Sequence, residues 1–287
     1  MKIRTDFVTN SSSSSFMVNL NLQTVDGTEI TIIKYDDSGD FMAEGCSFTA
    51  QDKEGKTICS ESCDPVSVYL ERGGDMFDDV PYEVYEVLDL GYSTLSLEKI
   101  SNASDINELK NAIVKPFGLD KYLTAEDGFD EYDEDEYDED EYEEEEYEED
   151  VVEMIEELRG RFNTMVDSCE EVFNQHFTKV SDLKTASVSM EFSGRGEFLA
   201  NKEEILGKIF YWDKFNKLKE ILKQEEDKIT KLRSLEFLNK FTQESLENLV
   251  DFWEKCDYAP AMCEVSQKLC EDGTITLSFA WDEHGIF

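Results

Sequence analysis

Residues 131–150 consist of four consecutive pentapeptides, each with tyrosine at its second position and acidic residues at the other four. The tyrosines are Tyr132, Tyr137, Tyr142 and Tyr147. A five-residue period matches neither the 3.6-residue period of a helix nor the two-residue period of a strand, so the rings cannot share one buried face. The crowded carboxylates also repel one another. We therefore expect residues 121–150, the acidic tract, to be disordered between two folded parts, residues 16–120 and 151–287.

The charge of the chain restricts the partners that we expect. The 287 residues include 68 acidic and 27 basic ones, which gives a formal net charge of -41. Such a field repels phosphate backbones and anionic lipid surfaces. Nucleic-acid binding takes most of its affinity from lysine and arginine contacts to phosphates. We therefore expect no direct nucleic-acid binding and no membrane binding, and we expect a basic protein surface as the partner.

The acidic tract is the predicted partner-binding site, because it joins exposed aromatic rings to dense negative charge. Charge steers the encounter with a basic surface, and each ring can add a cation-π contact of about 1 kcal/mol. The residues that we assign to this contact are Tyr132, Tyr137, Tyr142, Tyr147, Glu131, Asp135, Glu141 and Asp150.

A second hypothesis is that the chain imitates a nucleic acid and inhibits a DNA-binding protein. The range 126–150 holds 19 acidic residues and no basic ones, so the rest of the chain keeps a charge of -41 plus 19, or -22. Mimicry requires carboxylates held at fixed spacings, as phosphates are. A flexible tract does not supply this spacing, so we rank binding to a basic surface first.

The location is predicted from the apolar runs and the cysteines. The sequence contains no apolar run of the length that a secretory signal or a membrane span needs. Seven scattered cysteines, an odd number, fit a reducing compartment better than a disulfide framework. We therefore expect a cytoplasmic protein.

The first folded part is expected to be α+β with antiparallel hairpins. Two β-rich runs between Phe16 and Tyr35 flank an Asp-Gly pair, which favours a hairpin turn. A third strand is expected over Cys46–Ala50, followed by a turn at 53–56 into a further run at 57–58. Helices are expected at Tyr82–Leu90 and after Ser104, the latter ending at Pro116 and Gly118.

The second folded part is expected to be richer in helix. Apolar residues recur at spacings of three and four from Val151 to Val180, which predicts one long amphipathic helix. A strand at Thr185–Phe192, a helix over Lys202–Lys240 and a helix capped by Thr242 should follow. The part should end in a second Asp-Gly hairpin between Glu264 and Trp281.

The opening residues resemble a motif found in another group of proteins. Arg4-Thr5-Asp6-Phe7-Val8-Thr9-Asn10 precedes five serines and Phe16. This string is similar to an N-terminal motif that recurs in uncharacterised proteins of bacteria and phages, some of which also carry an acidic tract. The resemblance implies no activity. We expect residues 1–15 to be a flexible segment or a tag.

The candidate reactive residues have simpler structural interpretations. Cys46, Cys59 and Cys63 could suggest a metal site, but their spacing does not complete a tetrahedral ligand set. We expect buried thiols instead. His176 lies within the predicted long helix and is expected to be a packing residue.

No catalytic residue, metal site or cofactor is predicted. The sequence lacks a nucleophile elbow, a phosphate-binding glycine loop and a paired-histidine motif. The interpretation leans towards a protein that is not an enzyme. An enzyme or metal protein with an unrecognised site is the third alternative.

Overall fold

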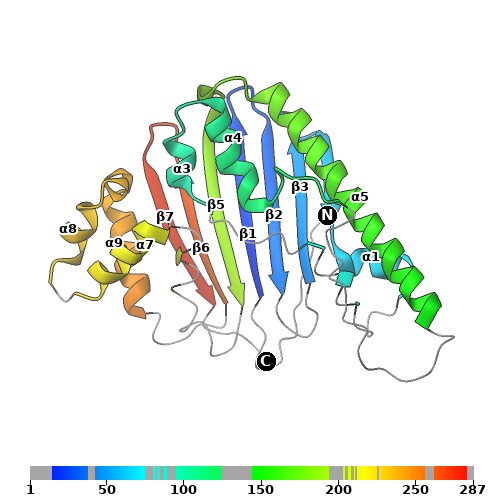
Figure 1. Cartoon of the computed structure of the whole chain (residues 1–287). Coiled ribbons are helices and arrows are strands. Elements are labelled where there is room, and N and C mark those ends of the chain that lie inside the picture. The colour runs from blue at the N-terminus through cyan, green and yellow to red at the C-terminus, as the bar shows by residue number, and fades with distance from the viewer. Residues whose placement is uncertain are drawn as a thin grey trace.

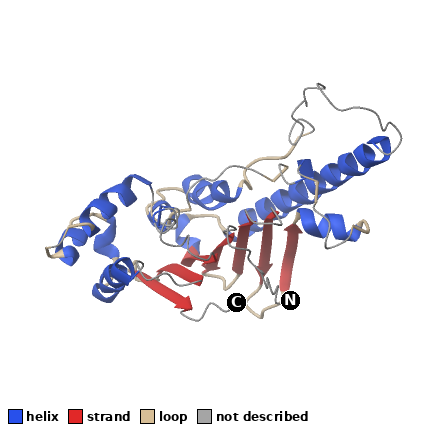
Figure 2. Ribbon diagram, turned by 90° about the horizontal axis from the view of Figure 1, so that it is seen from below, coloured by secondary structure: helices blue, strands red, loops and turns tan. Residues whose placement is uncertain are grey.

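In a computed structural model of the chain, the described residues are 15–37, 43–74, 80–81, 83–84, 87–88, 95–124, 144–193, 203, 206–207, 210, 212–224, 226–255 and 262–282. They form an α+β fold, which confirms the predicted class, with helices on one side of an antiparallel sheet (Figures 1 and 2). The predicted N-terminal segment up to residue 14, residues 125–143 of the acidic tract and most of the helix predicted at Tyr82–Leu90 lie outside the described residues.

One sheet joins strands from both predicted parts. The seven described strands are β1 (Ser15–Thr24), β2 (Glu29–Asp37), β3 (Ala43–Gln51), β4 (Thr57–Cys63), β5 (Leu183–Ser193), β6 (Met262–Leu269) and β7 (Ile275–Asp282). Their order is β4-β3-β2-β1-β5-β6-β7, and every neighbouring pair is antiparallel. The central pair, β1 and β5, comes from opposite sides of the acidic tract, with Leu20 opposite Val188. The two parts therefore share a sheet.

The β1–β2 and β6–β7 hairpin turns each contain a glycine with a positive φ angle. In the β1–β2 turn, Thr24 N donates to Thr28 O at 2.9 Å and Gly27 has a φ of 93°. Glycine adopts this left-handed conformation at little energetic cost because it has no Cβ atom. The resulting short turn has a backbone twist compatible with the right-handed twist of the two strands that it joins. The β6–β7 turn repeats the arrangement with Gly273 at a φ of 80°. Both predicted Asp-Gly hairpins are confirmed.

The described helices and 3-10 turns are α1 (Pro65–Glu71), α3 (Leu97–Ser101), α4 (Ile106–Val114), η1 (Lys115–Phe117), α5 (Glu144–His176), η2 (Val180–Asp182), α7 (Trp212–Leu222), α8 (Lys228–Arg233), η3 (Phe237–Lys240) and α9 (Gln243–Lys255). Helix α5 packs against β3 and β4, whereas α9 packs against β7. The helices α7, α8 and α9 gather at the β7 end of the sheet (Figure 1). The helices thus cover one face from edge to edge.

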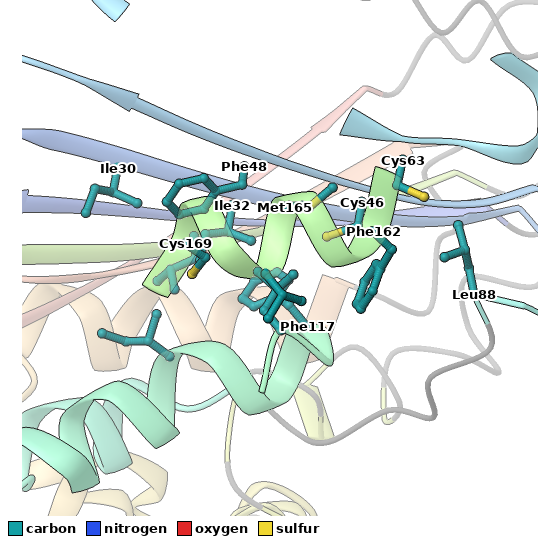
Figure 3. Packing of buried hydrophobic residues seen from close by; sticks show 14 of the residues in the cluster. Ile30, Ile32, Cys46, Phe48, Cys63, Leu88, Phe117, Phe162, Met165 and Cys169 are labelled. Atoms are coloured by element: carbon teal, nitrogen blue, oxygen red, sulfur yellow. The ribbon is translucent and has the colours of Figure 1, made fainter. Parts of the chain in front are cut away.

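The larger core lies between α5, α4 and the sheet. Alternate strand residues such as Ile32 and Phe48 are fully buried, as the two-residue period of a strand requires. On α5, Phe162 and Met165 are also fully buried and belong to the same cluster (Figure 3). A second core, around Phe252 and Ile275, lies beneath α7, α8 and α9. The periodic apolar residues from which the long helix was predicted therefore form its buried face.

Several predicted boundaries need correction. The helix predicted over Lys202–Lys240 is interrupted after Leu222, and Asp227, with a φ of 41°, caps the start of α8. Helix α4 is capped by Asp105, whose carboxylate accepts from two backbone N–H groups, instead of Ser104. The long helix ends at His176, before Val180. In both α8 and α4, an aspartate side chain accepts at least one hydrogen bond from a backbone N–H group of the first helical turn, and this determines where the helix begins.

Candidate protein-binding surface

The structure describes only part of the predicted partner-binding site. Glu131, Tyr132, Asp135, Tyr137, Glu141 and Tyr142 lie outside the described residues. Helix α5 begins at Glu144, so Tyr147 and Asp150 belong to its first turns. Asp150 is exposed. Residues 144–150 are therefore helical, so the prediction of disorder up to residue 150 is wrong for this range.

Local physical chemistry explains why a helix can begin among these acids. Glutamate is a good helix former, and the last two repeats contain more glutamate than the first two. Negative charge is favoured in the first turn, where the helix dipole is positive. From Val151 onwards the apolar residues of α5 are buried against the sheet, and this packing stabilises the whole helix.

The opposite side of α5 is strongly acidic, and we call it the outer face of α5. It consists of the exposed residues Asp150, Glu153, Glu156, Asp167, Glu170 and Glu171. A helix rises 1.5 Å per residue, so these carboxylates are distributed along roughly 32 Å. Unlike carboxylates in a disordered chain, they keep fixed positions relative to one another.

Arginines neutralise part of this surface. Arg72, just beyond α1, pairs with Glu153 and lies 3.8 Å from a carboxylate oxygen of Glu157. Arg161 on α5 itself pairs with Glu157 and with Glu71 of α1. The hydrogen bond and charge of Arg161 lower the pKa of Glu71. These ion pairs connect α1 and the residue that follows it to the first half of α5.

The second half of α5 combines acid with an exposed tyrosine. The hydroxyl group of Tyr122 donates a hydrogen bond to the carboxylate of Asp167. That hydrogen bond is the main cause of the raised pKa of Tyr122. Tyr122 is 51% exposed, and Glu170 and Glu171 lie on the next turn of the helix. The result is a folded surface with the same chemistry as the Tyr/Asp/Glu repeats.

Sequence reasoning missed Tyr122, which lies 45 residues before Asp167 in the chain. The segment around it has no helical or strand period. Its position is fixed instead by the next residue, since Leu123 N donates to Asn163 Oδ1 at 2.8 Å and Asn163 Nδ2 donates to Leu123 O at 3.0 Å. No local signal marks such a contact between a loop and a helix.

The expectation of buried thiols is confirmed for Cys46 and Cys63, whereas Cys59, near the start of the edge strand β4, is only partly buried. Cys46, Cys63 and Cys169 are buried between β3, β4 and α5 (Figure 3). Burial raises the pKa of Cys46 to about 12 despite the opposing charge of Lys34. Burial also raises the pKa of Cys63 and of Cys169. Within the described ranges, no group of three or more His, Cys, Asp or Glu residues is arranged to hold a metal ion.

His176 is a packing residue with a specific partner. It ends α5, and its Nδ1 atom lies 2.8 Å from Asp26 Oδ2 and 3.1 Å from Thr28 Oγ1. Its side chain is 11% exposed. The imidazole thus joins the end of α5 to the turn between β1 and β2.

Comparisons of the chain with known protein families, with curated proteins and with solved structures gave no match. Among the described helices, none combines the length and the apolar character that crossing a membrane requires.

Proposed function

We propose that this chain is a non-enzymatic interaction protein that binds a basic protein surface through its acidic tract and the outer face of α5. The observation that supports the proposal best is the exposure of Asp167, Glu170 and Glu171 beside the exposed ring of Tyr122. The same combination of ring and carboxylates repeats at Tyr132, Tyr137, Tyr142 and Tyr147.

Electrostatics gives this surface a defined mode of action. A net charge of -41 attracts a basic partner over distances comparable to the Debye length, about 8 Å at physiological salt, and so raises the association rate. At contact, tyrosine rings can stack on lysine or arginine groups for about 1 kcal/mol each. The affinity of such a complex falls steeply as salt increases.

Inhibition by nucleic-acid mimicry is the second candidate. The fixed spacing of the carboxylates on the outer face of α5 favours it. Charge density argues against it, because six carboxylates over roughly 32 Å give about one charge per 5 Å, whereas duplex DNA carries one per 1.7 Å. A surface about three times less dense fits an ordinary basic protein patch better.

A cytoplasmic location belongs to the same proposal. The five cysteines with described side chains, Cys46, Cys59, Cys63, Cys169 and Cys270, are free thiols. Free thiols are expected where glutathione and thioredoxin keep cysteines reduced.

Two variants separate the contributions of the tract and of the helix. Deletion of 126–143 removes three of the four repeat tyrosines and leaves α5 whole. The variant Glu156→Gln/Glu170→Gln/Glu171→Gln neutralises exposed carboxylates that have no ion pair within the described part of the chain. The control, Glu244→Gln/Glu247→Gln, neutralises two exposed carboxylates on α9.

The experiment measures recovery of basic proteins from a host lysate on each immobilised variant. We expect the α9 control to retain one defined basic partner, and both the α5 variant and the deletion to retain less of it. If both the α5 variant and the deletion retain that partner as the intact chain does, the proposal is wrong. Competition by duplex DNA would shift the assignment to mimicry.

A further inference from the structure

A cavity of about 630 Å³ lies between α3, α4, η1 and the start of α7. Its walls come from both sides of the acidic tract in sequence, since Lys99 and Lys115 precede the tract and Lys214 follows it. The helices α3 and α4 lie side by side in front of the sheet (Figure 1). Cavities of roughly 300–1,000 Å³ commonly hold small organic ligands.

The charge of this cavity is opposite to that of the chain. Of the described lining residues, three are lysines, Lys99, Lys115 and Lys214, and two are glutamates, Glu98 and Glu108. These five carry a formal charge of +1, whereas the whole chain carries -41. The three lysines belong to three different elements, α3, η1 and α7, which meet around this one cavity.

The glutamates in the wall already have partners. Glu108 Oε2 accepts hydrogen bonds from Ser104 N and Ser104 Oγ, both at 2.8 Å. Glu98 Oε1 lies 3.7 Å from Lys214 Nζ, which is an ion pair but too long for a direct hydrogen bond. Lys214 can therefore donate to an additional anion without giving up a hydrogen bond to Glu98.

Polar and apolar groups complete the lining. The Oδ1 atom of Asn102 accepts from Lys240 Nζ at 2.9 Å, which fixes this amide and leaves its N–H groups as donors. Asn111 supplies a second amide. Between the polar groups, Ala112 and Pro116 offer a small apolar wall against which a flat ring or short carbon chain can lie.

We propose that this cavity binds a small organic anion, with its phosphate or carboxylate group held by Lys99, Lys115 and Lys214 and its body lying against Ala112 and Pro116. Lysine acts as a point charge for such groups, and an anion held by several ammonium groups gains charge-assisted hydrogen bonds. This site is separate from the outer face of α5, and the inference does not depend on the proposed function.

The test uses pyridoxal 5′-phosphate, which forms a Schiff base with lysine that borohydride makes permanent. Uncharged pyridoxal, used in parallel, corrects for the intrinsic reactivity of each lysine. Peptide mapping of the intact chain gives the ratio of the two labels at Lys99, Lys115 and Lys214. The comparison sites are Lys217 and Lys223, exposed lysines at the same end of the fold and outside the cavity.

We expect the ratio at the three cavity lysines to exceed the ratio at Lys217 and Lys223 about tenfold, because the phosphate adds charge-assisted hydrogen bonds only in the cavity. The variant Lys115→Gln should lower the ratio at Lys99, whereas Lys217→Gln should leave it unchanged. Equal ratios at all five lysines, with the variant still folded, would overturn the inference.

Two competitors identify the source of the anion. Adenosine 5′-monophosphate carries a phosphate on a ring-sized body, and citrate carries carboxylates alone. Selective protection of the cavity lysines by the first assigns the site to an organic phosphate, and protection by the second assigns it to a carboxylate. If neither compound protects these lysines at millimolar concentration, the cavity is not a small-anion site and the inference fails.

Discussion

The Nδ1 atom of His176, at the end of α5, lies 2.8 Å from Oδ2 of Asp26 in the turn between β1 and β2. The two residues are 150 positions apart in the chain. Thr28 N also donates to Asp26 at 3.0 Å, and the Thr24 hydroxyl donates to the same carboxylate. This one carboxylate connects the last turn of the long helix to the first hairpin of the sheet.

We expect Asp26→Asn to lower the free energy of unfolding at pH 7 by roughly 1 kcal/mol, since the carboxylate is half exposed and solvent weakens its contacts. Burial alone would raise the pKa of Asp26, but hydrogen bonds from Thr24, His176 and Thr28 outweigh it and lower this pKa. The stabilisation is complete above the ordinary pKa of about 3.9 and is lost as pH falls towards the lowered value.

Urea unfolding of the two proteins between pH 7 and pH 2 measures this effect, and the difference should narrow on the acid side. The control is Asp272→Asn, because Asp272 occupies the equivalent place in the β6–β7 turn and accepts from Thr274 without a histidine. A double-mutant cycle with His176→Gln should show coupling only for Asp26. Additive effects would contradict the proposed contact.

Because the two parts share one sheet, we expect a destabilising substitution in the first part to lower the stability of the second part as well. Ile32 of β2 is fully buried, so Ile32→Ala should cost about 2–5 kcal/mol. All three tryptophans, Trp212, Trp253 and Trp281, come after the acidic tract. Because β1 and β5 pair along their length, the tryptophan fluorescence transition should shift to lower denaturant.

The exposed turn variant Glu54→Ala serves as the control and should leave the midpoint within about 0.5 kcal/mol of the starting protein. A tryptophan transition that does not move in Ile32→Ala would mean that the two parts unfold independently, against the continuous sheet.

The fold also contains an unfavourable pair of like charges. Glu191 of β5 lies directly opposite Glu264 of β6. Burial, and then the charge of Glu264, raise the pKa of Glu191. At neutral pH the ionised form is therefore penalised, so Glu191→Gln should stabilise the fold by a few tenths of a kcal/mol to about 1 kcal/mol.

Thermal unfolding checks this sign. The stabilisation should be complete above the raised pKa and should disappear as pH falls and Glu191 itself takes up a proton. Glu244→Gln, on the exposed side of α9, should have little effect at any pH. A destabilised Glu191→Gln would contradict this description of the pair.

The buried thiols should be protected from reagents. Cys46, Cys63 and Cys169 are buried with raised pKa values, so little thiolate is present to react at pH 8. We expect a maleimide to modify the partly exposed Cys59 and Cys270 before these three, which should react only on the timescale of unfolding, as followed by peptide mapping. Rapid modification of Cys46 in the folded protein would be inconsistent with the core.

The sequence predicted the elements whose signal is local. The Asp-Gly pairs identified two hairpins because glycine supplies the positive φ of the turn, and the apolar period identified α5 because its buried face meets the sheet. The pairing of β1 with β5 could not be predicted, since alternation in Leu20–Leu22 and in Val188–Met190 suits many partner strands.

The candidate site was only partly foreseeable for the same reason. The composition of the repeats is enough to predict an acidic and aromatic segment. The outer face of α5 and the contact of Tyr122 with it follow instead from which side of the helix is buried in the fold. The cavity between α3, α4 and α7 depends on segments that meet only in the folded chain.

The salt dependence of partner binding tests the central claim most directly. The full chain and the variant lacking 126–143 are compared for the affinity of the captured basic protein at several salt concentrations. We predict a steep loss of affinity with rising salt for the full chain, and weaker binding with a shallower salt slope for the deletion. Equal affinities and equal slopes would contradict the claim that the acidic tract binds the basic partner.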